Sequence, residues 1–578
     1  MSGYKMEEYD FLRDLNEKQK YVCVSEDNFI LTACPGSGKT RTLTYRLAFL
    51  CKKFAGSRLL NIAITYTNRA AEEIEERLID LNIETSNVWT GTIHSFCLNY
   101  IIRPYAMYHP RLKHGYRIID EYIKDEYIKS IAKELGIKGY INDLRKNERI
   151  KKEYYSLLEK NKEIDFDLIL LYACDLISNN IFIAENVSGI IRSIHVDEYQ
   201  DTNEIQYDIL AHIVNVNPQI NILFIGDVNQ AIFGNLGGVA KSAKEIRELY
   251  HVNFTEECLS GCYRSTQRIV DYYKHFEVAY TGVYSVAYHK KELGIIKYDS
   301  RINKNEMPCE IAQIIKNELS AGVKENEICV VAPAWHRIWN FTNQLRRLMP
   351  ETEFDAPDIS PIKKDPLNVF YLIARLLFTQ NSGHINSRKR IALEIMNILH
   401  MDFGVSVPEY IDNYLLLKTV NATVININDG IETLERAIDG LLSLLKIQKK
   451  DIPALNKSCL DFFEKTRTRI KSNDLKYDWD SIEKSFKEKK GIVVNTIHGV
   501  KGEEYTTVIG FSLHHGILPH WETVKKPNCQ DETYRLLYVL CSRAKKNIYL
   551  FSEEGCFSTN GYHYEATQDL KQYRFKYD

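Results

Sequence analysis

The chain has 578 residues, more than a single hydrophobic core serves, so we expect about three or four domains. Its 44% hydrophobic and 26% charged residues are typical of an ordinary soluble, globular protein. The net charge of −2, from 75 basic and 77 acidic residues, excludes a global electrostatic attraction to nucleic acid. Any such binding would need a local basic groove lined by aromatic side chains.

The lack of targeting segments and the placement of the cysteines narrow the class of protein further. No apolar run reaches 18 residues and no signal peptide follows Met1, so we expect neither a membrane-spanning nor a secreted protein. The 13 cysteines are scattered through apolar segments, as buried free thiols are in large intracellular proteins. The closest pair, Cys258 and Cys262, has no second pair or Cys/His cluster beside it, so we expect no structural metal.

A phosphate-binding loop is predicted near the start of the chain. Residues 28–33 form a short apolar strand, residues 33–40 read Ala-Cys-Pro-Gly-Ser-Gly-Lys-Thr, and residues 41–50 continue with helical periodicity. The backbone N–H groups of such a glycine-rich loop cradle phosphates. Lys39 would pair with the β- and γ-phosphate oxygens, and the Thr40 hydroxyl would bind Mg²⁺.

Further short apolar strands fall into two sets that are far apart in the chain. They lie at residues 61–66, 193–196 and 221–226, and at residues 491–495, 507–511 and 547–551. Strands of this kind that alternate with helices indicate parallel sheets covered on both faces, so we predict an α/β fold with two parallel-sheet domains. Residues 99–178 and 383–487 have helical spacing, and we interpret them as helical insertions, one in each domain.

A pair of carboxylates follows one of the predicted strands. Asp197 and Glu198 come directly after Val196, 158 residues beyond Lys39. The first carboxylate can reach Mg²⁺, and the second can orient and deprotonate an attacking water. The phosphate loop and the carboxylate pair, in this order, predict a nucleoside triphosphate hydrolase.

Over most of its length the chain resembles the UvrD/Rep/PcrA group of superfamily 1A helicases. The matching motifs lie at residues 15–19, 65–71, 91–97, 164–168, 197–201, 226–234, 262–265, 495–505 and 538–546. The resemblance implies two RecA-like P-loop domains, each with a helical insertion. The first domain would comprise residues 1–98 and 179–257 around the insertion 99–178. The second would comprise residues 258–382 and 488–578 around the insertion 383–487.

The resemblance implies that ATP and Mg²⁺ bind in the cleft between these two domains. The catalytic set would be Lys39, Asp197, Glu198, Gln230, Arg264 and Arg543, with Thr40 and Asp197 holding the metal. The nucleotide-binding set would be Gln19, Pro35, Gly36, Ser37, Gly38, Lys39, Thr40, Arg41, Tyr263 and Glu504. Arg264 and Arg543 would act as arginine fingers, because a planar guanidinium stabilises the negative charge that develops on the transferring phosphoryl group.

The same resemblance implies a groove for single-stranded DNA. Hydroxyl and amide groups can hold phosphates without reading sequence, and aromatic rings can stack on bases. For Phe96 the alternative is packing in the core. The implied contacts are Tyr66, Asn68, Thr92, His94, Phe96, Phe233, Thr496 and His498.

The segment after Gly234 departs from the pattern of the group. An aromatic followed by Arg-Gly-Ala is usual there, whereas residues 235–238 are Asn-Leu-Gly-Gly. A base-stacking platform and a coupling arginine are therefore missing, and both insertions look shorter than in the full-size enzymes. These departures bear on processive unwinding more than on hydrolysis. No nuclease constellation stands out after residue 551, so a fused nuclease is not expected.

The leading hypothesis is an ATP-driven DNA translocase and helicase of the bacterial cytoplasm, acting on single strands and duplex junctions with 3′→5′ polarity by analogy. The alternative is a DNA-sensing ATPase subunit that regulates a partner nuclease, as UvrD-like subunits of antiphage systems such as Gabija do. An inactive scaffold would require damaged catalytic positions, and none of them is missing. RNA stays open as a partner, because the expected contacts read backbone and base faces rather than the sugar.

Overall fold

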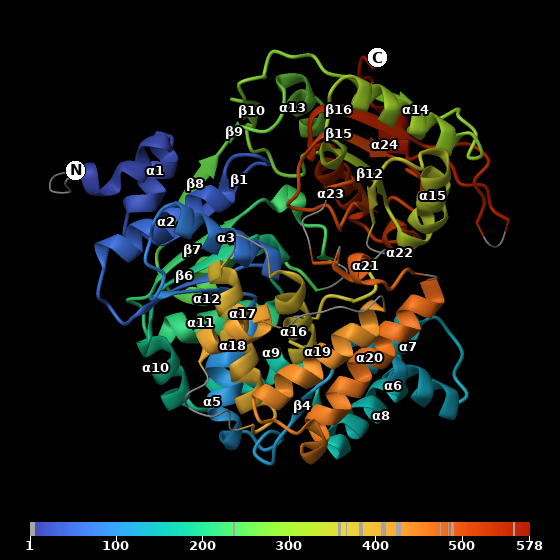
Figure 1. Cartoon of the computed structure of the whole chain (residues 1–578). Helices are drawn as coiled ribbons and strands as arrows, with labels where there is room; N and C mark the ends of the chain where they lie inside the picture. The colour runs from blue at the N-terminus through green and yellow to red at the C-terminus, as the bar shows by residue number, and fades with distance from the viewer. Residues whose placement is uncertain are drawn as a thin grey trace.

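The structure is a computed structural model with two parallel sheets, each covered by helices (Figure 1). It describes residues 6–578 except 235–236, 357–359, 366, 381–384, 406–411, 423–428, 474, 484, 487–489 and 559–560. The departure at Asn235 and Leu236, and the expected domain boundaries at 382–383 and 487–488, therefore lie outside the described residues.

The first sheet is entirely parallel. In spatial order its strands are β3 (Val88–Gly91), β2 (Leu60–Ile64), β6 (Ile191–Asp197), β7 (Asn221–Gly226), β1 (Phe29–Ala33) and β8 (Thr255–Leu259). Strand β7 lies between β1 and β6, so the phosphate loop after β1 and the carboxylates at the end of β6 emerge at the same edge, two strand positions apart.

Successive side chains along each strand point to opposite faces of this sheet, so an apolar core forms on each face. Phe29 and Leu31 of β1 face one cluster, whereas Ile30 faces the other. The first cluster is covered by α1 (Glu17–Val24), α2 (Lys39–Lys53) and α3 (Asn68–Asp80). The second is covered by α4 (Ile93–Cys97), α9 (Phe166–Asn179), α10 (Ile181–Gly189), α11 (Glu204–Val216) and α12 (Ala243–Tyr250).

The first helical insertion shares its core with this domain. After α4 the chain makes one π-helical turn, η2 (Leu98–Ile102), and continues through α5 (Arg103–Tyr105), β4 (Arg117–Ile118), α6 (Glu121–Glu134), α7 (Ile141–Lys146), α8 (Glu148–Asn161) and β5 (Glu163–Ile164). Ile150, Tyr154 and Leu158 form the buried stripe of α8 and join the cluster that packs under the sheet. The insertion and the sheet are therefore one packed unit.

Among the described residues, no single helix has the length and apolarity of a membrane span. Helices α9 and α10 reach that composition only as a pair bent by 103°.

The second sheet is also entirely parallel. Its strands, in spatial order, are β11 (Ile296–Asp299), β16 (Ala544–Phe551), β15 (Tyr505–Gly510), β12 (Ile328–Ala332), β14 (Ile492–Thr496) and β13 (Phe354–Asp355). One face packs on α13 (Gln267–Tyr273), α23 (Cys529–Cys541) and α24 (Gln568–Gln572), and the other on α14 (Met307–Ser320) and α15 (Trp335–Leu348). A two-stranded sheet of β9 (Gly261–Cys262) and β10 (Tyr284–Ser285) and the short helix α22 (Trp521–Val524) complete this domain. The predicted α/β class with two parallel sheets is confirmed.

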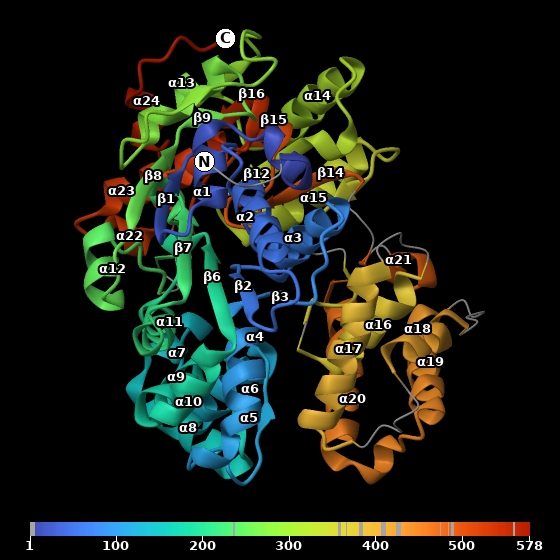
Figure 2. The same ribbon diagram turned by 90° about the vertical axis from the view of Figure 1, so that its left-hand side faces the viewer.

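The second helical insertion has a core of its own. Its helices are α17 (Ile385–Met401), α18 (Asn413–Ala422), α19 (Gly430–Leu444), α20 (Pro453–Asn473) and α21 (Trp479–Glu483). Helix α16 (Val369–Phe378), which precedes the insertion expected from the sequence at residues 383–487, packs into the same core. Figure 2 shows these helices as a separate group beside the helices of the first insertion. The buried cluster of this group contains no residue of either sheet, so it packs as a unit that is tethered to the rest of the chain.

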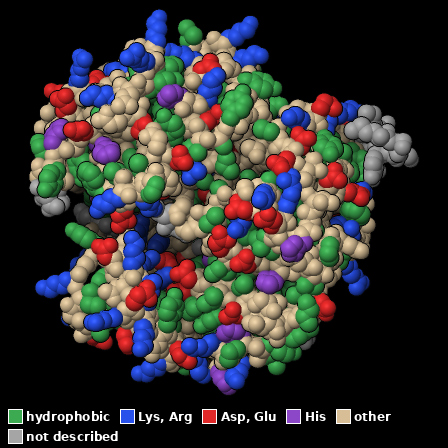
Figure 3. Space-filling model, turned by 180° about the vertical axis from the view of Figure 1, so that it is seen from behind, with side chains coloured by type: hydrophobic (Ala, Val, Ile, Leu, Met, Phe, Trp, Pro, Cys, Tyr) green, Lys and Arg blue, Asp and Glu red, His purple; other side chains and the backbone are tan. Residues whose placement is uncertain are grey.

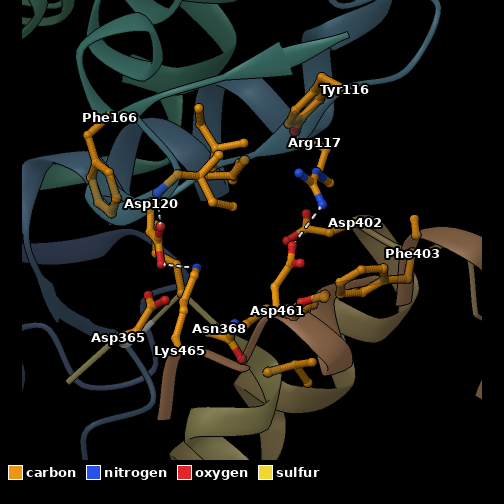
Figure 4. A pocket seen from close by; sticks show the side chains of 18 residues that line it. Tyr116, Arg117, Asp120, Phe166, Asp365, Asn368, Asp402, Phe403, Asp461 and Lys465 are labelled. Atoms are coloured by element: carbon orange, nitrogen blue, oxygen red, sulfur yellow. Dashed lines mark hydrogen bonds and ion pairs between the residues drawn. The ribbon is translucent and has the colours of Figure 1, made fainter. Parts of the chain in front are cut away.

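Ion pairs join the two insertions around a pocket that residues from both of them line (Figure 4). Arg117 pairs with Asp461 at 3.4 Å, and Lys465 pairs with Asp120. Asp365 lies beside the second pair, and burial, followed by the charge of Asp120, raises its pKa to about 6. The two insertions are thus held together by charge rather than by a shared apolar core.

The most buried of these ion pairs belongs to Arg103. Its side chain is 4% exposed, and its Nε and Nη2 donate to the two carboxylate oxygens of Asp402 at 2.9 and 2.7 Å. Glu394 lies 3.6 Å from the same guanidinium. The pair joins the start of the first insertion to the end of α17.

We expect Arg103→Ala to loosen the contact between the insertions and to lower the free energy of unfolding by about 3 kcal/mol, because it leaves Asp402 without its buried partner. Hydrogen exchange of α17 and urea unfolding would measure both effects. Arg436→Ala on α19 removes an exposed pair with Glu432 and serves as the control without such an effect. If α17 is equally protected from hydrogen exchange in both variants, the Arg103–Asp402 pair does not hold the insertions together.

Candidate active site

The phosphate loop adopts a conformation that depends on two glycines. Gly36 has a φ of +70° and Gly38 a φ of +82°. A Cβ on Gly36 would lie 2.6 Å from the Cβ of Arg264, so a larger residue there would collide with the second domain. Gly38 is the N-cap of α2 and supplies no side-chain cap, so the first N–H groups of the helix stay available for an anion.

Polar atoms in the loop fit a triphosphate. Ser37 is 1% exposed, and its Oγ has no hydrogen-bond partner within the described chain. A buried hydroxyl without a partner is costly, and phosphate oxygens would satisfy it. Lys39 and Thr40 occupy the first turn of α2, where the positive end of the helix dipole favours the same anion. Pro35 is buried in the loop.

Lys39 and the carboxylate pair meet at the edge of the sheet. The Nζ of Lys39 lies 3.2 Å from Glu198 Oε1. Burial opposes the charge on Lys39, but Glu198, Asp227 and Asp197 outweigh it and raise the pKa of the ammonium group. Burial and the charge of Glu198 raise the pKa of Asp197. For Glu198, burial acts in the same direction, yet Lys39 and then Lys501 outweigh it and lower its pKa. Glu198 is therefore the ionised member of the pair.

Glu198 is held in a strained backbone conformation. Its φ of +51° lies in the left-handed region, which is unfavourable for a residue with a side chain. The Glu198 N–H donates to Asp197 Oδ1 at 3.0 Å, and Gln200 Nε2 donates to the Glu198 carboxylate. Gln200 in turn accepts the Asp227 N–H at 2.9 Å. Local strain of this kind at a carboxylate pair is typical of a functional site.

Gln230 and Arg543 join the two domains next to this pair. Gln230 is 2% exposed; its Nε2 donates to Asp227 Oδ2 at 2.7 Å, and its Oε1 accepts from Arg543 Nη2 at 2.9 Å. Arg543 also donates to the backbone oxygens of Val539 and Glu503 at 3.0 and 3.2 Å. Burial, followed by the nearby Arg264, lowers the pKa of Arg543 to about 10. The side chain remains a cation aimed at the first domain.

Arg264 reaches the same cleft from the start of the second domain. Its Nε donates to Glu504 Oε2 at 2.7 Å, and its Nη1 donates to the Ser542 oxygen at 2.9 Å. Tyr263 donates its N–H to the Gly36 oxygen at 2.8 Å, so this segment rests directly on the phosphate loop. The Tyr263 ring is 48% exposed and available for stacking. Arg264 and Glu504, to which we assigned separate nucleotide contacts, are paired with each other here.

Gln19 and Arg41 lie beside the loop with partners of their own. The Gln19 amide accepts the Asn16 N–H and donates to the Ser37 oxygen, both at 3.0 Å, and so braces the loop. Arg41 lies 3.6 Å from Asp14 and stacks on Tyr45. Their expected adenine and nucleotide contacts remain predictions.

Several residues expected to contact DNA form a second cluster near Gln230. The rings of Tyr66 and Phe233 stack with centroids 4.7 Å apart, and His498 lies 5.6 Å from Phe233. Lys501 Nζ lies 5.2 Å from the centre of the Phe233 ring and donates to the Gln230 oxygen at 2.6 Å. Elements from both domains therefore meet at an aromatic patch next to the carboxylates, with the buried Lys501 behind it.

The remaining expected DNA contacts are less exposed. Asn68 is half-buried at the start of α3, and Thr92 caps α4 by accepting the Ser95 N–H at 3.3 Å. His94 is half-buried against Phe166. Thr496 is 7% exposed and accepts the Gly499 N–H at 3.1 Å. Their DNA contacts remain predictions.

Phe96 needs a correction, because the structure contradicts a contact with DNA. The ring is fully buried in the core of the first domain, with Trp89 at 5.6 Å and Tyr100 at 5.3 Å. A side chain without exposed surface cannot stack on a base. Packing in the core, the alternative left open from the sequence, is its role.

Four residues outside the predicted site sets take part in the site. Lys501 pairs with Asp201, whose side chain is 1% exposed, Asp227 anchors Gln230, and Gln200 holds the Glu198 carboxylate. All four lie inside the motif segments at residues 197–201, 226–234 and 495–505. Their place in the same motif segments as the predicted site residues is the feature of the sequence that could have identified them.

We expect Phe96→Ala to lower the free energy of unfolding by about 3–5 kcal/mol, because it leaves a cavity in the core of the first domain. Tyr66→Ala removes a ring that is 44% exposed and should cost clearly less. Chemical denaturation of both variants measures the difference. A Phe96→Ala protein as stable as Tyr66→Ala would contradict the corrected role.

Comparisons with known proteins agree with this geometry. Residues 15–151 and 135–251 match the UvrD/REP helicase N-terminal domain, and residues 470–555 match the UvrD-like helicase C-terminal domain. The protein named ATP-dependent DNA helicase PcrA from Staphylococcus epidermidis is 24% identical over 93% of this chain and 82% of its own length. The PcrA of Staphylococcus aureus is 24% identical over 92% of this chain and 82% of its own length. The probable DNA helicase II homolog of Mycoplasma capricolum is 25% identical over 94% of this chain and 85% of its own length. The chain belongs to the UvrD-like group of superfamily 1A helicases.

Proposed function

We propose that the protein is a DNA-dependent ATPase that translocates along single-stranded DNA and unwinds duplexes with 3′→5′ polarity. The observation that carries the proposal is the Gln230–Arg543 contact, which joins the two sheet domains beside the Lys39–Glu198 pair. A triphosphate held there would touch both domains at once, so its binding and loss would change how they meet.

The chain supplies groups for the phosphates of the nucleotide and for the metal that accompanies them. Lys39 and the free N–H groups of α2 would hold the β- and γ-phosphates, and Arg264 and Arg543 would reach them from the second domain. Thr40 and Asp197 would hold Mg²⁺, which neutralises phosphate charge when bound.

Glu198 is suited to act as the general base. Its lowered pKa keeps it ionised, and Gln200 fixes its carboxylate. When the triphosphate takes Lys39, the Lys39–Glu198 pair would part and leave Glu198 free to orient and deprotonate water. The pair thus holds the base in place until substrate arrives.

Contacts between Gln230 and the aromatic patch support a coupling of ATP hydrolysis to movement of the DNA-binding side chains. Phe233 follows Gln230 by three residues, and Lys501 contacts both the Gln230 oxygen and the Phe233 ring. A shift of Gln230 on phosphate release would move the ring against which Tyr66 stacks. Bases of a single strand would bind on these rings.

The surface charge favours local rather than global attraction to DNA. Figure 3 shows acidic and basic side chains interspersed over the face opposite that of Figure 1. The polarity and a place in the bacterial cytoplasm rest on kinship with bacterial helicases. Regulation of a partner nuclease has only sequence features in its favour, namely the departure at residues 235–238 and the shorter insertions. None of the relatives named above is described as a nuclease subunit.

We expect Glu198→Gln to bind ATP normally and to lose about 100-fold to 10,000-fold of its DNA-stimulated hydrolysis, because the amide cannot take a proton. Lys39→Ala should also weaken ATP binding. Steady-state ATPase assays and binding of a fluorescent ATP analogue measure these effects. Glu185→Gln, the same change at an exposed position of α10, is the control, and normal turnover of Glu198→Gln would refute the assignment.

ATPase rates with and without single-stranded DNA, and unwinding of duplexes with 3′ or 5′ tails, test the function as a whole. We expect DNA to stimulate hydrolysis and the 3′-tailed duplex to be unwound. Stimulation of ATP hydrolysis by DNA without duplex unwinding would contradict the helicase activity and favour a DNA-sensing ATPase. A protein inert toward ATP with every polynucleotide would overturn the proposal.

A further inference from the structure

Two loops meet at the edge of the second sheet that lies away from the nucleotide residues. Arg543 and Glu504 adjoin the amino ends of β16 and β15, whereas His514 follows the carboxyl end of β15 and Glu553 that of β16. Because strands of six and eight residues separate these ends, the loops form a place distinct from the proposed ATP site.

Three buried side chains with metal-binding atoms converge in these loops. His514, Glu553 and Cys556 are 0%, 4% and 3% exposed. One ligand atom from each lies within 4.8 Å of the other two, and Cys556 Sγ lies 3.7 Å from Glu553 Oε1. Donor atoms about 2.0–2.3 Å from a tetrahedral zinc ion lie about 3.3–3.8 Å apart, so the Cys556–Glu553 distance already matches one edge of such a site.

One ring nitrogen of His514 is fixed by a backbone carbonyl, and the other has no partner within the described chain. Its Nε2 lies 2.8 Å from the backbone oxygen of Glu553. A carbonyl oxygen only accepts, so Nε2 carries the proton and Nδ1 carries a lone pair. This Nδ1 is buried and has no partner within the described chain. A second ring nitrogen fixed by a carbonyl is the usual support of a histidine ligand.

Internal hydrogen bonds explain only part of the cluster. Glu553 accepts the N–H and hydroxyl of Ser512 at 2.9 and 2.6 Å, and Ser512 has a φ of +57°. The carboxylate therefore stabilises a turn that is unfavourable for serine. The Cys556 thiol donates to the same carboxylate. Neither contact satisfies His514 Nδ1. Glu553 Oε1 accepts from both the Ser512 hydroxyl and the Cys556 thiol, and it regains a lone pair when the thiol loses its proton, whereas Oε2 accepts the Ser512 N–H and keeps a further lone pair.

We propose that His514 Nδ1, a carboxylate oxygen of Glu553 and Cys556 Sγ bind one divalent cation of the zinc class, with a fourth position open to water. Imidazole nitrogen, carboxylate oxygen and thiolate sulfur together favour a borderline-soft ion such as Zn²⁺ over Mg²⁺ or Ca²⁺. Thiolate and carboxylate would supply two negative charges against the two positive charges of the ion.

The site would connect the ends of β15 and β16. His514 and Glu553 are 39 positions apart in sequence, and between them the chain forms α22 and α23 and reaches Arg543. A metal at this edge would fix both ends of the segment that delivers Arg543 to the cleft. Binding would displace the Cys556 proton, which is released to solvent.

Cobalt titration of the full chain tests the site, because Co²⁺ occupies zinc sites and a cobalt–thiolate bond absorbs light. After removal of metal with EDTA and dialysis, we expect Co²⁺ to produce a charge-transfer band and the visible bands of tetrahedral cobalt, both saturating at one equivalent. Zn²⁺ should displace the cobalt and abolish the bands. Zn²⁺ in hundredfold excess over its Kd should raise the thermal unfolding midpoint by about 2 °C, and EDTA should reverse the rise.

Matched variants assign the band to these residues. Cys556→Ser and His514→Gln should remove the charge-transfer band or reduce cobalt affinity at least tenfold. Cys459→Ser, at a buried thiol in the second insertion, should titrate as wild type. The wild-type titration needs no variant to fold, and absence of any band would overturn the proposal. A band that survives in Cys556→Ser would overturn it as well.

Discussion

The contact between Arg543 and Gln230 is the interaction on which the site depends. Arg543 is 2% exposed, and a buried guanidinium without partners would be strongly destabilising. Its donors are satisfied by Gln230 in the first domain and by backbone oxygens in its own domain. The two sheets therefore cannot move apart at this point without exposing or replacing that contact, and a γ-phosphate is the replacement with the right charge.

Two of the three cations expected to meet phosphates, Lys39 and Arg264, are held by carboxylates in this structure. Lys39 pairs with Glu198, and Arg264 pairs with Glu504. Buried charges need a partner of opposite sign, so these pairs keep the side chains ordered before the nucleotide binds. The price of this order is that the nucleotide must displace two carboxylates. The same exchange releases Glu198, which gives the pairing a part in the chemistry as well as in stability.

The two helical insertions are attached in physically different ways. The first continues the core of its sheet, whereas the second closes its own core and contacts the first through ion pairs around a pocket. Apolar contacts are insensitive to salt, while ion pairs near the surface weaken as salt screens them. Arg103, at 4% exposure, is the least screened of these contacts. The position of the second insertion is therefore more sensitive to ionic conditions than that of the first.

Local patterns in the sequence are enough to predict the fold class, the two sets of strands and the phosphate loop with its carboxylate pair. The apolar run at residues 221–226, for example, predicts a strand and forms β7. The family resemblance was confirmed by the comparisons. The burial of Phe96 in the core and the contact of Lys501 with Gln230 are visible only in the folded chain. Folding alone brings His514 into a cluster with two residues about 40 positions away. Burial and contact between distant segments depend on how the sheets pack, and residue spacing does not encode that packing.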